Sequence, residues 1–227
     1  MKNILARGGI EFLAVIMGIS GSLWLDDNNT YKNDRKQEYE AYDRLSNALS
    51  EDIKIINKAL LENERRLEIL ISMMNNIEDL SDDTLSTYID QTQNYVDINP
   101  HISDYETLKN TGRLYKIRDI DLLQKIIDLY DNKYGVIELF KVEDKRAIFM
   151  QDEYYINNYS MQPSPIWTTL KNVKQDRKRL MNDMVYKNYI VFLYKVKSGV
   201  KRRWTELKDD ILSLQNEIQT KIDQKES

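Results

Sequence analysis

The amino-acid sequence predicts an all-α protein, in which an N-terminal transmembrane helix is followed by an elongated antiparallel helical bundle of three long and several short helices. Three observations support this fold class. Gly and Pro, which mark most turns, number only 7 and 3 in 227 residues, so long helices are favoured over many strands. Apolar residues recur at steps of three and four over long segments, as on one face of an amphipathic helix. The third observation is an apolar run near the N-terminus.

The apolar run extends from Ile4 to Leu25 and is followed at once by two Asp and two Asn residues. As a helix with a rise of about 1.5 Å per residue, it covers roughly the 30 Å hydrocarbon core of a bilayer. Trp24 falls where aromatic residues often lie at the membrane interface. We therefore expect a membrane anchor helix in residues 1–28 and a helical bundle domain in residues 29–227.

Two other interpretations of the apolar run remain open. A cleavable signal peptide could end near Ser20-Gly21-Ser22, although apolar residues continue through 23–25. A buried helix of a soluble protein is the second, because the uncharged stretch from Phe12 to Leu25 is short for a membrane span. An uncleaved anchor agrees best with the whole run.

Basic residues flank the run on both sides, with Lys2 and Arg7 before it and four basic residues between positions 32 and 44 after it. A count of these charges keeps the bundle in the cytoplasm. Long domains, however, cross the membrane largely regardless of flanking charge, and the short basic N-terminus is typical of a signal anchor. We expect a single-pass protein of the inner (cell) membrane, with a slight preference for an extracytoplasmic bundle.

The first bundle helix is predicted over residues 34–80, which contain neither Gly nor Pro and continue from the anchor. Ser81 has the position of an N-cap for a short helix that ends near Asn94. Residues 95–102 form a loop, because Pro100 forces the preceding residue out of the helical region.

Two further signals define the next short helix. Ser103 and Glu106 have the spacing of a capping box. The helix that they begin ends at Gly112, where we expect a structural turn with glycine in the left-handed C′ conformation.

The other two long helices follow. Asp119 is expected to cap the second, which runs to about Tyr155 and can bend at Gly135. Pro163 and Pro165 break the chain, and the last long helix is predicted for residues 168–223. Since each long helix has one apolar stripe, the stripes can be buried only against each other.

Two patterns resemble a family of uncharacterised single-pass, membrane-anchored helical proteins of bacteria, known as a domain of unknown function. The first is a Glu at the entry of a Gly-containing apolar span with an Asn-rich exit, here Glu11, Gly18 and Asn28-Asn29. The second is formed by Tyr105, Leu108, Gly112, Leu114 and Ile117, followed by a Leu/Ile-rich helix from Leu122 to Tyr134. The resemblance implies a helical architecture and a membrane location, and it implies no activity.

The sequence offers little for catalysis or for cofactor binding. Zero Cys excludes disulfides and thiolate metal sites, and His101 as the only histidine excludes sites built on His pairs. His101 lies in a loop and is interpreted as solvated. Isolated glycines form no phosphate-binding loop. We expect no enzyme, no catalytic or metal-binding residues and no cofactor.

Charged residues of the bundle have mainly structural interpretations. Two basic clusters, in residues 171–179 and 195–203, contain apolar residues at core spacing, so a solvated helix face is favoured over nucleic-acid binding. Asp52, Asn63 and Asp144 fall on or beside apolar stripes. They either pair inside the bundle and determine its register or lie on an exposed flank.

On a helical anchor, Glu11, Ala14, Gly18 and Ser22 share one face. Small residues at this spacing allow close helix approach in lipid, and a carboxylate in the membrane needs water, a proton or a partner. The face is therefore a candidate membrane-helix interface; alternatives are that Glu11 reaches the headgroups beside Arg7 or handles protons beside a partner channel. The expected partners are the lipid bilayer and a second copy or a partner membrane protein.

Together these features predict a membrane-anchored interaction or scaffold module. The alternative is a ligand-sensing helical bundle that works with a partner membrane protein.

Overall fold

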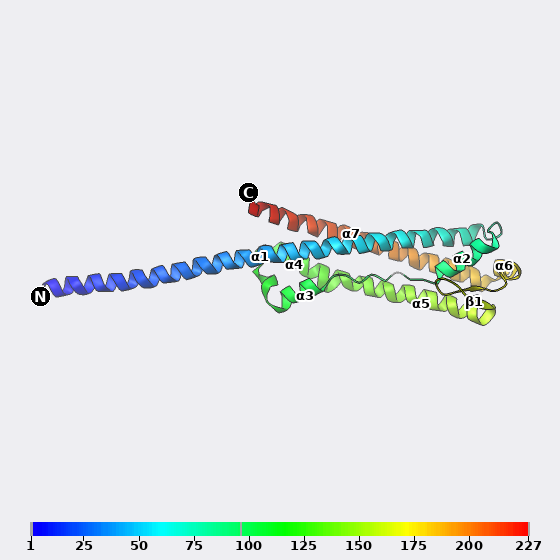
Figure 1. Ribbon diagram of the computed structural model, residues 1–227, viewed down its shortest axis with the longest axis horizontal. Helices are drawn as coiled ribbons and strands as arrows, with labels where there is room; N and C mark the ends of the chain where they lie inside the picture. Colours follow the sequence, from blue (N-terminus) through cyan, green and yellow to red (C-terminus); the bar gives the residue numbers. More distant parts are fainter. Residues whose placement is uncertain (1, 96, 227) are drawn as a thin grey trace.

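The computed structural model describes residues 2–95 and 97–226, with side chains described for residues 15–95 and 97–224. It is mostly helical, at 83%. Helix α1 (Lys2–Asn75) is one continuous helix of 74 residues, and its N-terminal part projects beyond the rest of the molecule (Figure 1). The predicted first bundle helix therefore continues from the N-terminal segment without a break.

Three long helices form an elongated body. Helix α5 (Tyr134–Asn158) runs in the same direction as α1, and α7 (Met184–Glu226) returns antiparallel to both and packs against each of them (Figure 1). The predicted antiparallel packing is confirmed for α7. Helices α1 and α5 are instead parallel, because the chain between them crosses back along the body before α5 begins.

Helices α1 and α7 pack on each other along what we call the α1–α7 seam, and the buried face of each helix follows a heptad pattern. Buried positions on both helices alternate in steps of three and four, the period that keeps one face of a helix against a partner. On α1 these are Glu38, Tyr42, Leu45, Leu49, Asp52, Ile56, Ala59, Asn63, Arg66, Leu70 and Met73. On α7 they are Tyr186, Ile190, Leu193, Lys197, Val200, Trp204, Leu207, Ile211, Leu214 and Ile218.

The apolar core is divided into two clusters along the body. The proximal core joins residues 41–59 of α1 to the start of α5 and to residues 200–218 of α7. The distal core joins the end of α1 to the later part of α5 and to the start of α7. Between them the seam positions are polar, as described below.

The first short helices correct one prediction. Helix α2 (Asp82–Thr92) begins after Ser81, whose hydroxyl accepts the N–H of Thr84 at 3.1 Å, so the predicted N-cap is confirmed. Helix α3 (Ser103–Asn110) has no capping box, because Ile102 occupies the N-cap position and no side chain caps the helix. The N–H of Glu106 bonds to the Ile102 carbonyl, so the helix starts one residue too early for the Ser103 hydroxyl to cap it.

The second long helix is interrupted. After the 3-10 helix η1 (Arg113–Lys116), α4 (Ile120–Asp128) begins at Asp119, whose carboxylate accepts the N–H of Leu122 as predicted. A π-helical turn, η2 (Leu129–Lys133), then joins α4 to α5. The irregularity therefore lies just before Gly135, in a segment where two tyrosine rings pack on each other.

A β-hairpin replaces the predicted start of the last helix, so the fold is not strictly all-α. Strand β1 (Met161–Pro163) pairs antiparallel with β2 (Thr168–Leu170). The carboxylate of buried Asp90 on α2 accepts the Ser164 hydroxyl and the backbone N–H groups of Ile166 and Trp167. The turn is therefore stabilised by a residue that is distant in sequence. The local pattern of apolar residues could not predict this contact.

The last helix is also broken at Asp183. Helix α6 (Val173–Asn182) ends there, and the Asp183 carboxylate accepts the N–H of Val185 at 2.8 Å, which starts α7. The prediction of one helix over 168–223 is therefore wrong at its N-terminal end, because Asp183 stabilises a new helix start.

Gly112 follows Thr111, the C-cap residue of α3, and has φ 72° and ψ 0°, in the left-handed region. An added Cβ would meet no atom within 4 Å, so a side chain there is opposed by the backbone conformation alone. We expect Gly112→Val to lower the free energy of unfolding by about 1–3 kcal/mol and Gly112→Asn to lower it less, measured by urea denaturation. Gly135→Ala, in a helix with equal space, is the control, and an unchanged Gly112→Val protein would contradict this account.

Candidate functional site

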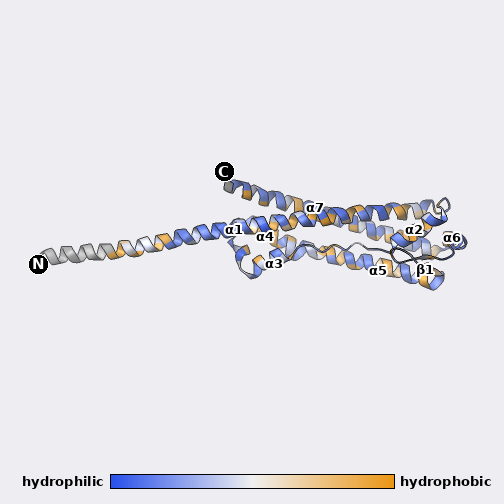
Figure 2. Ribbon diagram, in the orientation of Figure 1, coloured by the Kyte–Doolittle hydropathy of each residue, from blue (hydrophilic) through white to orange (hydrophobic). Residues whose placement is uncertain are grey.

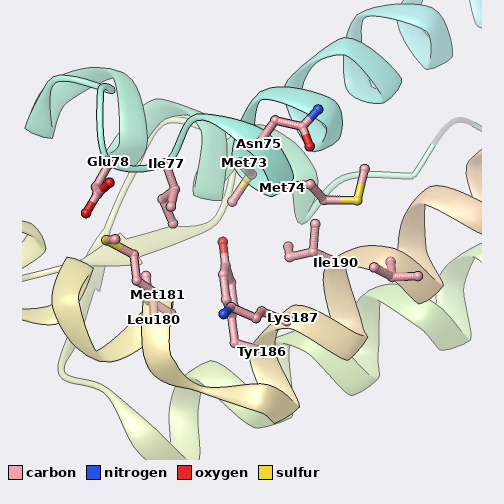
Figure 3. A pocket seen from close by; sticks show the side chains of 11 residues that line it. Met73, Met74, Asn75, Ile77, Glu78, Leu180, Met181, Tyr186, Lys187 and Ile190 are labelled. Carbon is pink, nitrogen blue, oxygen red and sulfur yellow. The ribbon is translucent and has the colours of Figure 1, made fainter.

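A pocket of about 360 Å³ lies at the end of the body farthest from the N-terminus, where α1 ends and α6 and α7 meet (Figure 3). It exists because α1 stops at Asn75 while α7 begins beside it at Met184. The lining is mainly apolar and comes from the end of α1 and its following turn, from α6 and from α7: Met73, Met74, Asn75, Ile77, Glu78, Leu180, Met181, Tyr186, Lys187, Ile190 and Val191.

Polar groups are placed at the edge and on one wall of this distal pocket. Tyr186 is buried, and its ring extends from α7 with the hydroxyl toward Met73 and Ile77 (Figure 3). Burial raises the pKa of Tyr186 well above its usual value, so the hydroxyl stays protonated. Glu78 and Lys187 are exposed at the opening. Three methionines give the wall an adaptable shape, so the pocket suits a small apolar molecule with one polar end.

A second polar centre surrounds Asp52, which is 1% exposed. Its carboxylate accepts the backbone N–H of His101 at 2.8 Å, lies 2.9 Å from His101 Nδ1 and accepts the Tyr134 hydroxyl at 2.5 Å. His101 is therefore not merely solvated, as its loop position suggested. Asp52 joins α1 to the 97–102 loop and to α5.

This centre is structural rather than nucleophilic in character. Burial and the Asp52 charge raise the pKa of Tyr134, so its hydroxyl remains protonated at neutral pH. A protonated phenol donates a hydrogen bond to a carboxylate and is a poor nucleophile. The arrangement explains the buried charge of Asp52 through three hydrogen bonds and requires no reaction.

A third polar centre, the polar layer, separates the proximal and distal cores. Lys197 on α7 is completely buried, and its Nζ lies 2.7 Å from Asp144 on α5. Asn63 on α1 donates its Nδ2 hydrogen to the Lys197 carbonyl at 2.9 Å. The layer therefore links all three long helices at one level.

In the polar layer, ion pairing opposes the free-energy cost of burying charged groups. Desolvation lowers the pKa of Lys197 to about 8, while the negative charge of Asp144 opposes that shift. Arg66 is also buried at this level, and its Nη1 forms no hydrogen bond with any described residue. An arrangement of this kind favours one pairing of helices over alternatives, although it adds little net stability.

Asp52, Asn63 and Asp144 are all buried and hydrogen-bonded or ion-paired, so the alternative of an exposed flank does not hold. Lys197 is a correction, because the sequence assigned it to a solvated basic cluster. The sequence did contain a signal for its burial. Position 197 falls in the three-and-four spacing of the apolar residues Ile190, Leu193 and Val200, with a lysine in place of an apolar residue.

The predicted membrane-helix interface is only partly described. The side chains of Glu11 and Ala14 lie outside the described residues, while Gly18 and Ser22 are exposed on the projecting part of α1. Large apolar side chains lie on all sides of the helix around Gly18 and Ser22, and no other described part of the chain covers them. They are Val15, Ile16, Met17, Ile19, Leu23, Trp24 and Leu25. Within that part, no helix has a stretch both long and apolar enough to span a membrane.

Metal binding receives no support from the described residues, which contain no group of three or more His, Cys, Asp or Glu side chains placed to hold an ion. Comparisons with protein-family models, curated proteins and solved structures found no match. The candidates for function are therefore the distal pocket and the exposed apolar surfaces.

The polar layer yields a stability test. Lys197→Met leaves the Asp144 carboxylate buried without its partner, and we expect the free energy of unfolding to fall by about 3–5 kcal/mol. The double variant Asp144→Leu/Lys197→Met removes both charges and should recover much of that loss, as measured by urea denaturation.

Lys195→Met, on the exposed side of the same helix turn, is the control and should change stability by less than about 0.5 kcal/mol. A double variant that is no more stable than Lys197→Met would show that the two charges are not coupled.

Proposed function

We propose that the protein is a membrane-anchored helical interaction module, in which residues 4–25 insert into a bilayer and the bundle extends from its surface. The observation that supports this proposal is the exposed apolar segment of α1. Its seven large apolar side chains are exposed, and at about 100° per residue their positions fall on all sides of the helix. Figure 2 shows that this apolar part of α1 projects beyond the bundle. A surface of this kind requires a covering, and hydrocarbon covers all sides of a helix at once.

The shape of the body also supports an interaction role. One continuous helix connects the apolar segment to the distal end, so the bundle would stand away from the membrane as a rod. The resemblance to membrane-anchored bacterial helical proteins agrees with this proposal and adds no activity. The side of the membrane on which the bundle lies stays a prediction of the sequence.

Membrane insertion is tested with the full chain. We expect the protein to remain in the membrane pellet after an alkaline carbonate wash. Ile16→Arg/Ile19→Arg should release it into the wash, because each arginine near the centre of a span adds about 2.5–3.5 kcal/mol to insertion.

Ile16→Leu/Ile19→Leu is the matched control and should stay in the pellet. Since both positions are exposed and far from the core, neither pair of changes affects the bundle. Wild-type protein in the wash would contradict the proposal.

The distal pocket supports a second candidate function, the sensing of a small apolar ligand. Its methionine-lined wall, the Tyr186 hydroxyl and the two rim charges are the observation that favours it. The ligand would bind at the end of α1, whose other end carries the apolar segment, so one helix connects the two places.

Decanoate and decan-1-ol are suitable probes of this pocket. A ligand at a hundredfold excess over its dissociation constant stabilises the folded state by about 2.7 kcal/mol, which should raise the melting temperature by about 5 °C or more. Met74→Trp fills the pocket and should abolish the shift, whereas Ile71→Trp, exposed one turn earlier, should not. An equal shift in both variants would place the ligand elsewhere.

A further inference from the structure

Helix α5 carries a second apolar stripe on the side that faces away from the α1–α7 seam. Positions 135, 139, 142, 146, 149, 153 and 156 are all exposed and alternate in steps of four and three. We call them the outer stripe. Four of its side chains are large and apolar, and each is more than half exposed: Leu139 at 61%, Val142 at 58%, Phe149 at 65% and Ile156 at 62%.

This period is the one that α1 and α7 use to pack on each other. A heptad stripe on a helix surface is a surface for another helix, because side chains at these positions stay in line along a straight partner. Solvated helix faces carry charges, whereas the outer stripe contains only two, Arg146 and Glu153.

The two charges are opposite and lie seven residues apart, two helical turns, on either side of Phe149. Neither forms an ion pair or a hydrogen bond with any residue that the structure describes, whereas Lys141 and Asp144 on the same helix both have ion-pair partners. When the helix is turned end over end, the negative charge takes the place of the positive charge, and the positive charge takes the place of the negative one. A surface with this property is complementary to its own copy in one orientation.

We propose that the outer stripe of α5 pairs with the outer stripe of a second copy in antiparallel orientation, around a two-fold axis between positions 149 and 150, next to Phe149. In this arrangement Arg146 of each copy lies beside Glu153 of the other, which gives two ion pairs. Val142 lies beside Ile156 of the second copy, and the two Phe149 rings meet at the centre. A parallel pair would place arginine beside arginine and glutamate beside glutamate, which like-charge repulsion disfavours.

The surface next to the outer stripe extends the same contact. A groove of about 260 Å³ runs between α5 and α7, lined by Met150, Val185, Asn188, Tyr189 and Phe192. Val185 and Phe192 are themselves exposed. An α5 helix of a second copy would therefore contact apolar side chains of α7 as well as those of α5. This additional area matters because a stable interface buries more surface than one stripe provides.

The second copy is thus the partner of the proposed interaction module. The pairing rests on the interaction part of that proposal, and it is tested separately from membrane insertion. The chain contains no cysteine, so single cysteines can report on the pairing of the full-length protein in a mild detergent. Phe149→Cys should form a disulfide-linked dimer under mild oxidation. Val142→Cys should not link to itself, but it should link to Ile156→Cys when the two proteins are mixed.

The charges provide the second measurement. Arg146→Glu should weaken the dimer at least tenfold in sedimentation equilibrium, because the introduced carboxylate then meets Glu153 of the other copy. Arg146→Glu/Glu153→Arg restores opposite signs and should restore dimerisation. Glu138→Arg, exposed on α5 but outside the outer stripe, is the control.

Three results would overturn the proposal. Self-linking of Val142→Cys would mean a parallel pair, and a monomer at all concentrations would mean that another molecule or lipid covers this face. Equal dimerisation of wild type and Arg146→Glu would mean that the charges do not determine the pairing. If the protein fails the carbonate test but dimerises as expected here, only the membrane anchor is rejected and the pairing stands.

Discussion

The α1–α7 seam is the constraint on which the rest of the structure depends. Buried positions on both helices follow a heptad along most of the bundle, and this period keeps one face of each helix against its neighbours over that length. A seam made only of apolar side chains would tolerate a shift of one heptad. The polar layer opposes such a shift, because Lys197 and Asp144 would lose each other and leave charges buried without partners. The register therefore depends on this ion pair between the two apolar cores.

The other elements take their positions from this seam. Helix α5 is joined to it twice, through Asp144 in the polar layer and through Tyr134 on the Asp52 carboxylate. The chain reaches α5 by returning along the body, which makes α5 parallel to α1. The distal pocket arises where the seam ends, since α1 stops at Asn75 and α7 begins at Met184 after the Asp183 cap.

The sequence predicts several parts of this fold that local chemistry determines, although the local signal at Ser103 was misread and the one at Asp183 was missed. The helix caps at Ser81 and Asp119, and the course of α1, follow from side chains next to the backbone groups that they satisfy or from an uninterrupted pattern. The hairpin could not be predicted, because the Asp90 carboxylate that holds its turn is more than seventy residues away in sequence. Lys197 illustrates a different limit. Its charge suggested solvent, while its place in the heptad indicated burial, and only a partner carboxylate on another helix could reconcile the two.

The common direction of α1 and α5 determines where paired molecules can be anchored. If two copies join through antiparallel α5 helices, their N-terminal segments leave in opposite directions. Leu25 lies about 65 Å along α1 from the level of Phe149, so the two apolar segments of such a pair are roughly 130 Å apart. They cannot enter the same flat bilayer. If the two segments insert into bilayers as proposed, the pair would bridge two facing membrane surfaces, and the length of α1 would determine the width of the gap between them.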